Sequence, residues 1–287
     1  MGVLMSGKET VVKVGIVKLG CVGTAPMLEF LLDERADRKD IDVRVVSSGA
    51  KMDPDKAEEV AKKLLDFKPH FAIVVSPNAA LPGPTKAREI LKEAGLPVIV
   101  ISDAPAKKAM GDLESKGFGA IIVEADAMIG ARREFLDPVE MACFNADIIK
   151  VLAATGVYNI VVDYVDRVIA AFKEGKTPEL PRVVVDKETA NAATGYSNPY
   201  AKAKAMAAFE TARRVADLTT EACFKIQEWE RYTPIAAAAH EMLRNAAKLA
   251  DEAREIEKYS DTLQRAPHAK DGSPMVKSKL MEKPVKK

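Results

Sequence analysis

The chain has 287 residues, and its 43 basic and 42 acidic side chains leave a formal net charge of only +1. This balance argues against broad electrostatic binding to nucleic acid, and no run approaches the roughly 18 apolar residues of a membrane-spanning helix. Residues 1–10 lack the apolar core of a signal peptide, so we expect a cytoplasmic protein with a flexible N-terminal extension and no membrane or nucleic-acid partner.

The segment from Val11 to Leu32 is typical of a buried strand, a glycine turn and a helix. In α/β sheets, a strand that enters a helix through such a turn is a place where ligands bind. Gly20 and Gly23 allow a sharp turn, and Thr24 can cap the helix. The spacing differs from the G-x-G-x-x-G of a dinucleotide fingerprint, so a tight turn that holds no ligand remains an alternative.

Four more strands are expected to follow, at residues 41–48, 71–75, 96–101 and 117–124, with helices between them. This alternation predicts a parallel sheet with right-handed crossovers. Ligands of such sheets bind beyond the carboxyl ends of the strands. Those ends are rich in Gly, Pro, Ser, Asn and Asp, and they are expected at residues 19–24, 47–49, 76–78, 102–105 and 124–126.

From Asp126 onward the pattern is mostly helical, with an isolated strand expected at residues 182–185 and a helical stretch at 221–259 that breaks at Pro234. The alanine-rich helices suggest an oligomer interface, and Asp271-Gly272 predicts a β-hairpin. The predicted fold class is α/β. We expect a parallel, Rossmann-like sheet domain with the ligand site at residues 11–126, a helical bundle for oligomerisation and part of the cleft at 127–260, and a small C-terminal β segment with a tail at 261–287.

The cysteines Cys21, Cys143 and Cys223 are far apart and odd in number. They form no C-x-x-C pair, and the sequence contains no H-E-x-x-H motif, so we expect no metal site and, in a reducing compartment, no disulfide. Cys21 lies in the glycine turn, where it either lines a site or is only a small, tolerated side chain.

Several family-typical segments occur together and in order. The longest runs from Asp126 to Met141 and reads Asp-Ala-Met-Ile-Gly-Ala-Arg-Arg-Glu-Phe-Leu-Asp-Pro-Val-Glu-Met. The others are residues 31–38, 51–54, 82–89, 103–105, 145–147, 151–156, 239–242, 251–255 and 267–269. In these segments the chain resembles the coenzyme F420-dependent methylenetetrahydromethanopterin dehydrogenases of methanogenic and sulfate-reducing archaea, over nearly everything from Val12 to about Met281.

The resemblance implies a reaction of archaeal one-carbon metabolism, in methanogenesis from CO2. A hydride moves reversibly between methylene-tetrahydromethanopterin and the deazaflavin coenzyme F420, which gives methenyl-tetrahydromethanopterin and reduced F420. F420 acts as a dissociable cosubstrate, and no metal, flavin or nicotinamide is needed. The partners implied are the tetrahydromethanopterin-type one-carbon carrier and further copies of the same chain, in a homohexamer built as a trimer of dimers.

Under this resemblance, the loops after the first three strands are expected to bind F420. The candidates are Gly20, Cys21, Val22, Gly23, Thr24, Ser48, Gly49, Pro77 and Asn78. Backbone N–H groups and helix N-termini suit the phosphate of the coenzyme, and basic side chains suit its glutamate tail. Lys18, Lys51 and Arg88 are possible contacts of the tail, although each is as well explained as a solvated surface charge.

The carrier is expected to meet Asp103, Asp126, Arg132, Arg133 and Glu134. A carboxylate can accept hydrogen bonds from the amino-pyrimidinone part of the pterin, but both aspartates also suit helix caps. The Arg132-Arg133-Glu134 run either clamps a ligand or forms a structural or intersubunit salt bridge.

Direct hydride transfer depends on the placement of two ring systems, so no side chain is expected to be obligatory as an acid or base. Asn78, Asp103 and His240 are candidates for positioning, with a structural histidine as the alternative for His240.

Two other functions remain open at this stage. The chain could be a non-enzymatic, ligand-binding α/β module, because fold does not determine function. It could also be a dehydrogenase of the same carrier that uses a nicotinamide, although the missing G-x-G-x-x-G argues against that coenzyme.

Overall fold

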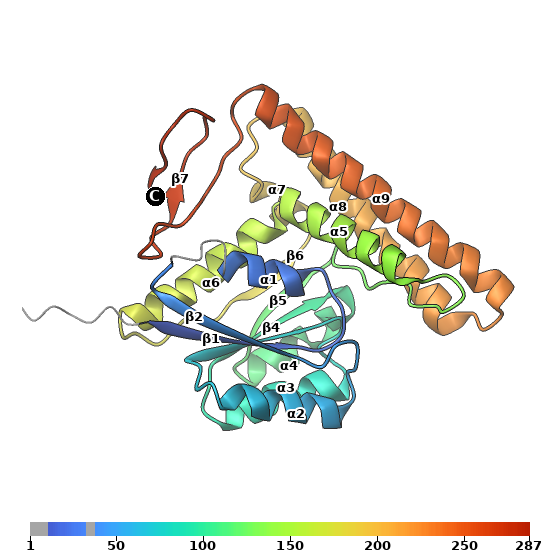
Figure 1. The fold of residues 1–287 in the computed structure, drawn as a ribbon, viewed down its shortest axis with the longest axis horizontal. Coiled ribbons are helices and arrows are strands. Elements are labelled where there is room, and N and C mark those ends of the chain that lie inside the picture. Colours follow the sequence, from blue (N-terminus) through green and yellow to red (C-terminus); the bar gives the residue numbers. More distant parts are fainter. Residues whose placement is uncertain (1–10, 33–37) are drawn as a thin grey trace, which may run out of the picture.

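The computed structural model describes residues 11–32 and 38–287, so the extension expected at residues 1–10 lies outside the described residues. Within these ranges, six parallel strands form one sheet in the order β2-β1-β3-β4-β5-β6 (Figure 1). They are β1 (Val12–Lys18), β2 (Ile41–Ser47), β3 (Phe71–Ser76), β4 (Val98–Asp103), β5 (Gly119–Val123) and β6 (Arg182–Val185). The prediction of a parallel α/β sheet is confirmed.

Helices cover both faces of this sheet (Figure 1). One face carries α2 (Pro54–Leu65), α3 (Pro82–Glu93) and α4 (Met110–Ser115), and the other carries α1 (Thr24–Leu32), α5 (Pro138–Ala154) and α6 (Val157–Lys173). Successive side chains of a strand point to opposite faces. Phe71 and Ile73 therefore join the core beneath α1, α5 and α6, while Ala72 and Val74 join the core against α2 and α3. The strand β3 is buried along its whole length, as expected of a covered parallel sheet.

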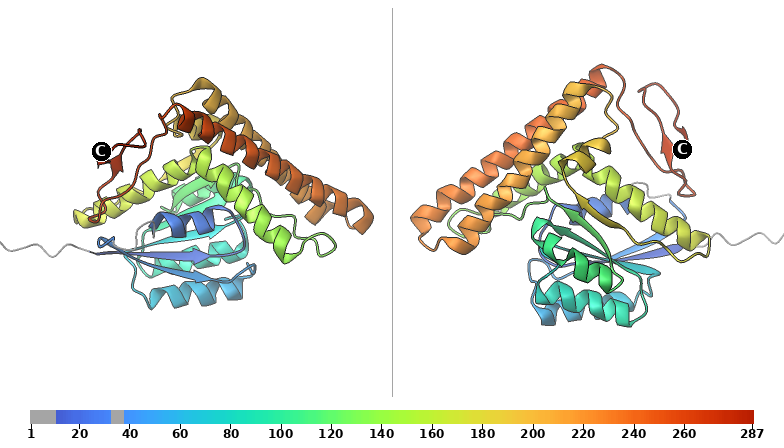
Figure 2. Two further views of the ribbon diagram at one scale, coloured as in Figure 1. Left: turned by 45° about the horizontal axis from the view of Figure 1, so that its top comes forward. Right: turned by 180° about the vertical axis from the view of Figure 1, so that it is seen from behind.

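Helices α8 (Pro199–Thr220) and α9 (Trp229–Tyr259) form a long antiparallel pair that lies beyond α5 (Figure 2). The remaining elements are η1 (Ala104–Ala109), α7 (Lys187–Ala192), η2 (Glu221–Lys225), β7 (Met275–Val276) and β8 (Val285–Lys286). The buried faces of α8 and α9 consist largely of small residues, among them Ala201, Ala205, Ala208, Ala212, Ala239, Ala246, Ala250 and Ala253. Small side chains let the two backbones approach closely, which accounts for the straight, extended pair.

The strand at Arg182–Val185 is not isolated, contrary to the sequence prediction. It is the sixth strand of the sheet and pairs in parallel with β5, with Ile121 opposite Val183. Two helices, α5 and α6, separate β5 from β6 along the chain, so the pairing could not be inferred from neighbouring elements. Strand β6 thus joins the sheet from within the part predicted to be a helical bundle. The expected division of the chain at residue 126 stays a prediction.

The predicted break at Pro234 is also wrong. Pro234 lies inside α9, and the interruption occurs earlier, where Ile226 is extended after the π-helical turn η2. Pro234 is the sixth residue of α9, so the helix continues through a position that has no N–H to donate to the Glu230 carbonyl. Residues 127–136, in the part expected to be mostly helical, form an irregular loop with a turn at residues 133–135.

The C-terminal segment forms a small antiparallel unit, as predicted. Gly272 has a φ of +76° in the turn after Asp271, and Arg265 and His268 form bridges with Lys277 and Pro274. Strand β7 pairs in antiparallel fashion with β8. Imidazole Nε2 of His268 lies 2.7 Å from Oδ2 of Asp166, which fastens this segment to α6.

No single helix within residues 11–32 and 38–287 has the length and apolar composition needed to cross a membrane. The helices α5 and α6 meet that test only jointly, with a bend of 71° between them. Both helices bury a face in the main hydrophobic core.

Substituting Gly156 by alanine is expected to destabilise the fold. Gly156 joins α5 to α6 at a φ of +95°, and a Cβ there would lie 1.9 Å from the carbonyl oxygen of Ala190. The left-handed backbone and the clash together should lower the free energy of unfolding by roughly 2–4 kcal/mol, measured by urea denaturation.

Gly175→Ala is the matched control. Gly175 has a φ of +67°, but nothing lies within 4 Å of a Cβ built on it, so only the backbone term of about 1 kcal/mol applies. Equal losses of stability in the two variants would contradict the clash.

Candidate functional site

The loops that follow β1, β2 and β3 meet at the carboxyl edge of the sheet. Gly20 has a φ of +77°, and a Cβ built on it would lie 2.7 Å from Sδ of Met52 and 3.0 Å from Cδ of Pro77. The sheet continues from β1 to β2 on one side and to β3 on the other, so Gly20 and Pro77 flank the point where the strand order reverses. Open α/β sheets bind ligands at such a switch point. The turn at Gly20 and the loop at Pro77, both predicted to bind the coenzyme, are thus brought together.

The opening turn is held by a buried carboxylate that follows β5. Asp126 Oδ1 accepts a hydrogen bond from the Gly23 N–H at 2.6 Å, and Oδ2 accepts from the N–H and hydroxyl of Thr24 at 3.0 and 2.6 Å. Burial raises the pKa of Asp126, and these hydrogen bonds oppose the rise. Two N–H groups at the start of α1, predicted to bind the coenzyme, thus donate to the chain itself. Of the other turn residues, Cys21 is half-buried and Val22 is buried.

Asp103 lies at the end of β4 and is almost completely buried. Its Oδ1 accepts a hydrogen bond of 2.6 Å from the Ala104 N–H, which caps η1. Burial, together with the nearby charge of Asp126, raises the pKa of Asp103 well above its usual range. A raised pKa favours the protonated form, in which a carboxyl group can donate as well as accept a hydrogen bond.

The loop between β3 and α3 contains Pro77 and Asn78. Oδ1 of Asn78 accepts a hydrogen bond of 3.0 Å from the Ala80 N–H, so only the amide NH2 of this half-buried side chain remains for other partners. Arg88, a possible contact of the coenzyme tail, is 2% exposed and donates from Nη1 to the Ala79 carbonyl at 2.6 Å. It therefore supports the loop from beneath rather than reaching toward solvent.

The loop after β2 is more open. The Ser48 hydroxyl donates to the Lys51 carbonyl at 2.5 Å. Gly49 has a φ of +67° with nothing within 4 Å of a Cβ built on it. Lys51 is exposed and Lys18 is half-buried. These residues border free space at the same edge of the sheet as Gly20.

Arg132 contacts the junction of α8 and α9. Its Nε donates to the Ala222 carbonyl at 2.7 Å and its Nη2 to the Ile226 carbonyl at 2.8 Å. The guanidinium also lies 4.2 Å from the ring centroid of Tyr232. A turn of π-helix that ends in extended chain leaves carbonyl groups without helical donors, and the planar guanidinium satisfies two of them.

The neighbouring residues Arg133 and Glu134 make different contacts from those of Arg132. A side-chain hydrogen bond with Tyr232 lowers the pKa of Glu134, so this carboxylate also faces the helix junction. Arg133 is exposed, and no hydrogen bond or ion pair joins it to another residue of the described ranges. Of the three residues predicted to clamp a ligand, Arg133 is the one whose side chain makes no hydrogen bond within the described ranges.

His240 is buried between aromatic rings. Its Nδ1 lies 2.8 Å from Oε1 of Glu140, and its ring centroid lies 4.7 Å from that of Phe135 and 4.5 Å from that of Phe144. Burial lowers the pKa of His240, although the bond with Glu140 opposes this. Its Nε2 is buried and has no hydrogen-bond partner. A neutral imidazole at this place faces the loop near Gly130, where a Cβ would lie 3.7 Å from Nε2.

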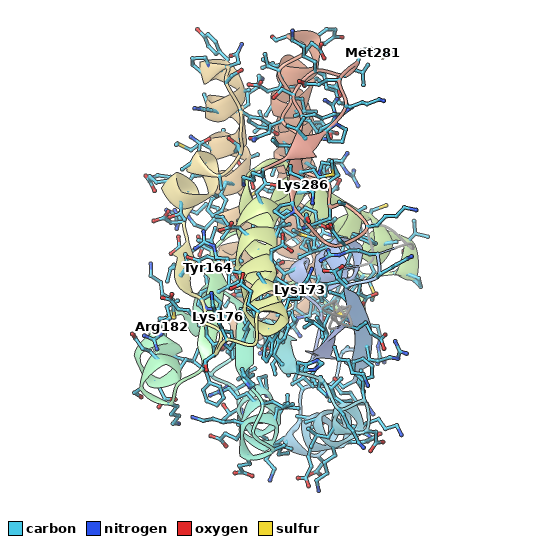
Figure 3. The ribbon with its side chains drawn as sticks, turned by 90° about the vertical axis from the view of Figure 1, so that its left-hand side faces the viewer. Tyr164, Lys173, Lys176, Arg182, Met281 and Lys286 are labelled. Atoms are coloured by element: carbon cyan, nitrogen blue, oxygen red, sulfur yellow. The ribbon has the colours of Figure 1, made fainter. Side chains whose placement is uncertain are left out.

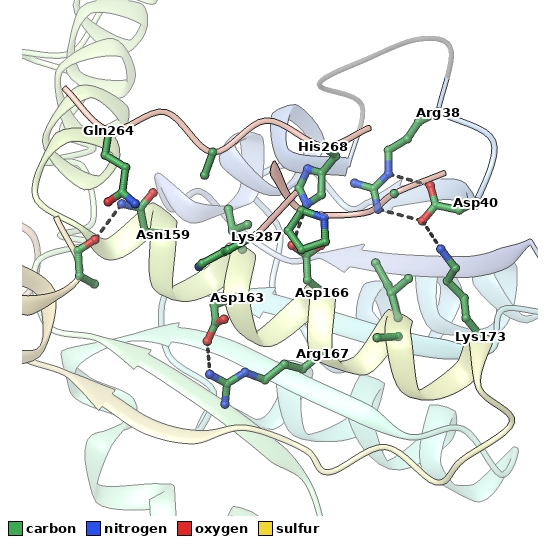
Figure 4. Close-up of a pocket in the computed structure, with 17 residues that line it drawn as sticks. Arg38, Asp40, Asn159, Asp163, Asp166, Arg167, Lys173, Gln264, His268 and Lys287 are labelled. Atoms are coloured by element: carbon green, nitrogen blue, oxygen red, sulfur yellow. Dashed lines mark hydrogen bonds and ion pairs between the residues drawn. The ribbon is translucent and has the colours of Figure 1, made fainter. Parts of the chain in front are cut away.

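A cavity of about 480 Å³ lies elsewhere, between α6 and the C-terminal segment (Figure 4). Figure 3 looks onto this side of the molecule, with Lys173 at the end of α6 and Lys286 on the C-terminal segment. The cavity is lined by ion pairs such as Arg38–Asp40 and Arg167–Asp163, and none of the predicted site residues lines it. The predicted site and this cavity are therefore separate.

Within the described ranges, no group of three or more His, Cys, Asp and Glu side chains is arranged to hold a metal ion. All three cysteines are free thiols.

Comparison with known proteins identifies the family. The family model for methylene-5,6,7,8-tetrahydromethanopterin dehydrogenase matches residues 12–285. The chain belongs to this family. An F420-dependent methylenetetrahydromethanopterin dehydrogenase of Archaeoglobus fulgidus is 62% identical over 96% of this chain and 99% of its own length. The protein of that name from Methanothermobacter thermautotrophicus is 56% identical over the same shares of the two chains.

The family is also represented by a solved structure with ligands. It is described as F420-dependent methylene-tetrahydromethanopterin dehydrogenase in complex with methylene-tetrahydromethanopterin and coenzyme F420. The two folds superpose with a TM-score of 0.93 at 50% identity, over 96% of this chain and 100% of the other. The whole architecture described above is thus shared with that family member.

Asp103→Asn is expected to stabilise the protein increasingly as the pH rises. Because the folded-state pKa of Asp103 lies above the unfolded value, the folded carboxyl keeps its proton while the unfolded one ionises. The contribution of this carboxyl group to the free energy of unfolding therefore falls as the pH rises from about 4 to the raised pKa. Asparagine does not ionise, so the variant does not show this loss. Thermal unfolding should show similar midpoints at pH 4 and, at pH 7.5, a higher midpoint for the variant than for the wild type. A difference that is the same at both pH values would contradict the raised pKa.

Proposed function

We propose that the chain catalyses reversible hydride transfer between a methylene-tetrahydromethanopterin-type carrier and the deazaflavin coenzyme F420. The products are methenyl-tetrahydromethanopterin and reduced F420, in the one-carbon metabolism of archaea that form methane from CO2. The observation that carries this proposal is the close match, over nearly the full length of both chains, to the solved family structure whose described ligands are these two molecules.

The carrier gives up a hydride with its electron pair and becomes a cation. The coenzyme accepts the hydride at a ring carbon and becomes the reduced anion, which takes up a proton from water to give neutral reduced F420. The transfer itself requires no proton from the protein. What the chain contributes is placement of two flat ring systems and a low-dielectric environment. Such a role is consistent with a site made of loop backbone, the two buried carboxyl groups of Asp103 and Asp126, and few free charges.

The residues at the switch point fit an anionic, flat coenzyme. We assign its binding to the turn at residues 20–22 and to the loops at 48–49 and 77–78, with Lys18 and Lys51 close to its charged tail. The space around Gly49 and the exposure of Lys51 support this assignment. Gly23 and Thr24 shape the turn, because Asp126 already accepts their N–H groups.

For the carrier, we assign direct contacts to Asp103 and Arg133. Asp103 offers a carboxyl group to the pterin at the end of β4, and Arg133 offers an exposed guanidinium that makes no hydrogen bond or ion pair within the described ranges. Three of the predicted residues do not contact the carrier themselves but fix the turn and the loop that carry the contacting groups: Asp126, Arg132 and Glu134.

We further propose a cytoplasmic homohexamer, assembled as a trimer of dimers. Large apolar side chains are exposed around the start of α5 and the α8–α9 junction, namely Val139, Met141, Phe224 and Trp229. Clusters of exposed apolar side chains favour burial against another protein surface. A second copy of the chain is the partner that the family resemblance implies.

Turnover is expected to survive each single substitution at Asn78, Asp103 and His240. Wild type mixed with oxidised F420 and the methylene carrier should lose the visible absorbance of the coenzyme, and NAD or NADP offered instead should give no reaction. Asn78→Ala, Asp103→Asn and His240→Gln should slow this loss by up to about a hundredfold, because each change disturbs placement alone.

Two results would count against these assignments. An inactive but folded wild type would refute the enzymatic function and favour a ligand-binding module. Complete loss of turnover in one variant that still binds both ligands would instead identify an obligatory acid or base.

Raising the salt concentration is expected to weaken coenzyme binding, because charges near the surface are screened within about 8–10 Å at physiological ionic strength. Lys51→Gln should weaken binding at low salt and reduce this salt dependence. Lys68→Gln is the control: Lys68 is exposed, but it precedes β3 and so lies at the opposite edge of the sheet. Fluorescence titration of F420 measures both, and equal effects of the two changes would contradict a role for Lys51.

A further inference from the structure

One residue of the β3–α3 loop is held by side chains at both of its backbone polar groups. The Ala79 N–H donates to Oγ of Ser102 at 2.9 Å, and the Ala79 carbonyl accepts from Nη1 of Arg88 at 2.6 Å. The Ser102 hydroxyl in turn donates to the Ser76 carbonyl at 2.7 Å. Ala79, Ser102 and Ser76 are fully buried, and Arg88 is 2% exposed. We call this arrangement the Ala79 clamp.

The serine half of the clamp follows from the strand register. Ser76 and Ser102 are the last paired residues of β3 and β4 that face each other. Beyond them the chain after β3 turns away, so the backbone ladder ends there. The Ser102 hydroxyl bridges the Ser76 carbonyl and the Ala79 N–H, and thus continues the hydrogen bonding for three more residues as a side-chain link.

The arginine half is energetically unusual. No carboxylate in the described part of the chain forms an ion pair with Arg88, its Nε is buried without a partner, and its guanidinium lies 5.6 Å from the ring centroid of Phe118. Burying an unpaired charge costs free energy. In this place the charge makes one strong hydrogen bond, to the Ala79 carbonyl. A neutral core residue would fill the volume but leave that carbonyl with only the Thr85 hydroxyl as a donor, at 3.4 Å.

The clamp fixes both ends of the Pro77–Asn78 dipeptide. Ser76 precedes this dipeptide, Ala79 follows it, and both are tied to Ser102. Pro77 in turn lies against Gly20, since its Cδ would be 3.0 Å from a Cβ on that glycine. Any movement of Ala79 would therefore shift Pro77 relative to the opening turn at the switch point.

We propose that Ser102 and Arg88 are positioning residues for coenzyme binding. They touch neither ligand; they hold the Pro77–Asn78 loop in the conformation that binds F420 before the coenzyme arrives. This inference rests on the proposed function for the identity of the ligand. Its structural core, the immobilisation of the loop by two buried side chains, is testable without any ligand.

The chain offers a matched pair of variants. Ser102→Ala removes the hydroxyl that bridges the loop. Ser76→Ala removes an equally buried hydroxyl on the facing residue, and Oγ of Ser76 has no hydrogen-bond partner. Both variants lose one buried oxygen at the same edge of the sheet, and only the first opens the clamp.

Hydrogen–deuterium exchange of residues 78–81, followed by mass spectrometry without ligand, should be about tenfold faster or more in Ser102→Ala and unchanged in Ser76→Ala. The dissociation constant of F420, from fluorescence titration, should rise about tenfold in Ser102→Ala and stay within about twofold in Ser76→Ala. Carrier binding should change by less than about twofold in either variant, which a general loss of structure would not allow.

Arg88→Met gives an independent test, because it keeps the apolar stem and removes the donor to Ala79. It should accelerate exchange of the same segment and weaken F420 binding in the same direction. Since both side chains hold Ala79, the double variant Ser102→Ala/Arg88→Met should weaken binding by less than the product of the two single effects.

The possible failures are distinguishable. A wild type that neither binds F420 nor turns over contradicts the proposed function, while the exchange measurement still tests the clamp. If wild type binds F420 and Ser102→Ala binds it equally well, or if Ser76→Ala weakens binding as much, the positioning role is refuted. Exchange of residues 78–81 at the wild-type rate in Ser102→Ala would show that the loop does not depend on the clamp.

Discussion

The structure depends on one buried carboxylate. Asp126, at the end of the fifth strand, receives three hydrogen bonds from Gly23 and Thr24 at the start of the first helix. The N–H groups at a helix N-terminus form a natural anion site, which other α/β folds use for a phosphate. Here the chain fills that site with its own side chain. The opening turn is thereby fixed to the segment that follows β5, and the N–H groups of Gly23 and Thr24 are already engaged within the chain.

The same principle recurs around the carboxyl edge of the sheet. The loop after β3 is held by Ser102 and Arg88, and the loop after β5 by Arg132, through hydrogen bonds to backbone groups. Each of these side chains donates a hydrogen bond to the backbone of the protein itself. Hydride transfer between two bound rings is sensitive to small displacements. A site whose loops are fixed before ligands bind loses less free energy to ordering them, which suits a reaction that needs placement more than acid–base chemistry.

Much of this fold could be predicted from the sequence, because periodicity and turn residues act locally. The first five strands, the parallel sheet and the Asp271-Gly272 hairpin follow from such patterns. The position of β6 does not: it is four residues long and reaches β5 only after two intervening helices. The start of α9 also escapes local rules, since the preceding π-helical turn, rather than Pro234, determines it.

The sequence predicts the location of the candidate site more readily than the role of each residue in it. Strand ends predict where ligands bind, yet the partner of a polar side chain depends on contacts between residues far apart in sequence. Asp126 meets Thr24 across 102 residues, and Arg132 meets Ala222 across 90. Ser102 carries no signal at all, because its importance arises from its register with Ser76.

The hydrogen-bond partners of each polar side chain narrow the set of candidate ligand contacts in a way that sequence patterns do not. A buried polar group needs a hydrogen bond, so side chains engaged within the fold are poor candidates for ligand contacts. Asp126, Arg88 and Arg132 fall in this group. The candidates that remain are the buried carboxyl group of Asp103 and the exposed guanidinium of Arg133. Adjacent residues of one motif, such as Arg132 and Arg133, therefore differ in their contacts: Arg132 donates to the Ala222 and Ile226 carbonyls, whereas Arg133 makes no hydrogen bond or ion pair within the described ranges.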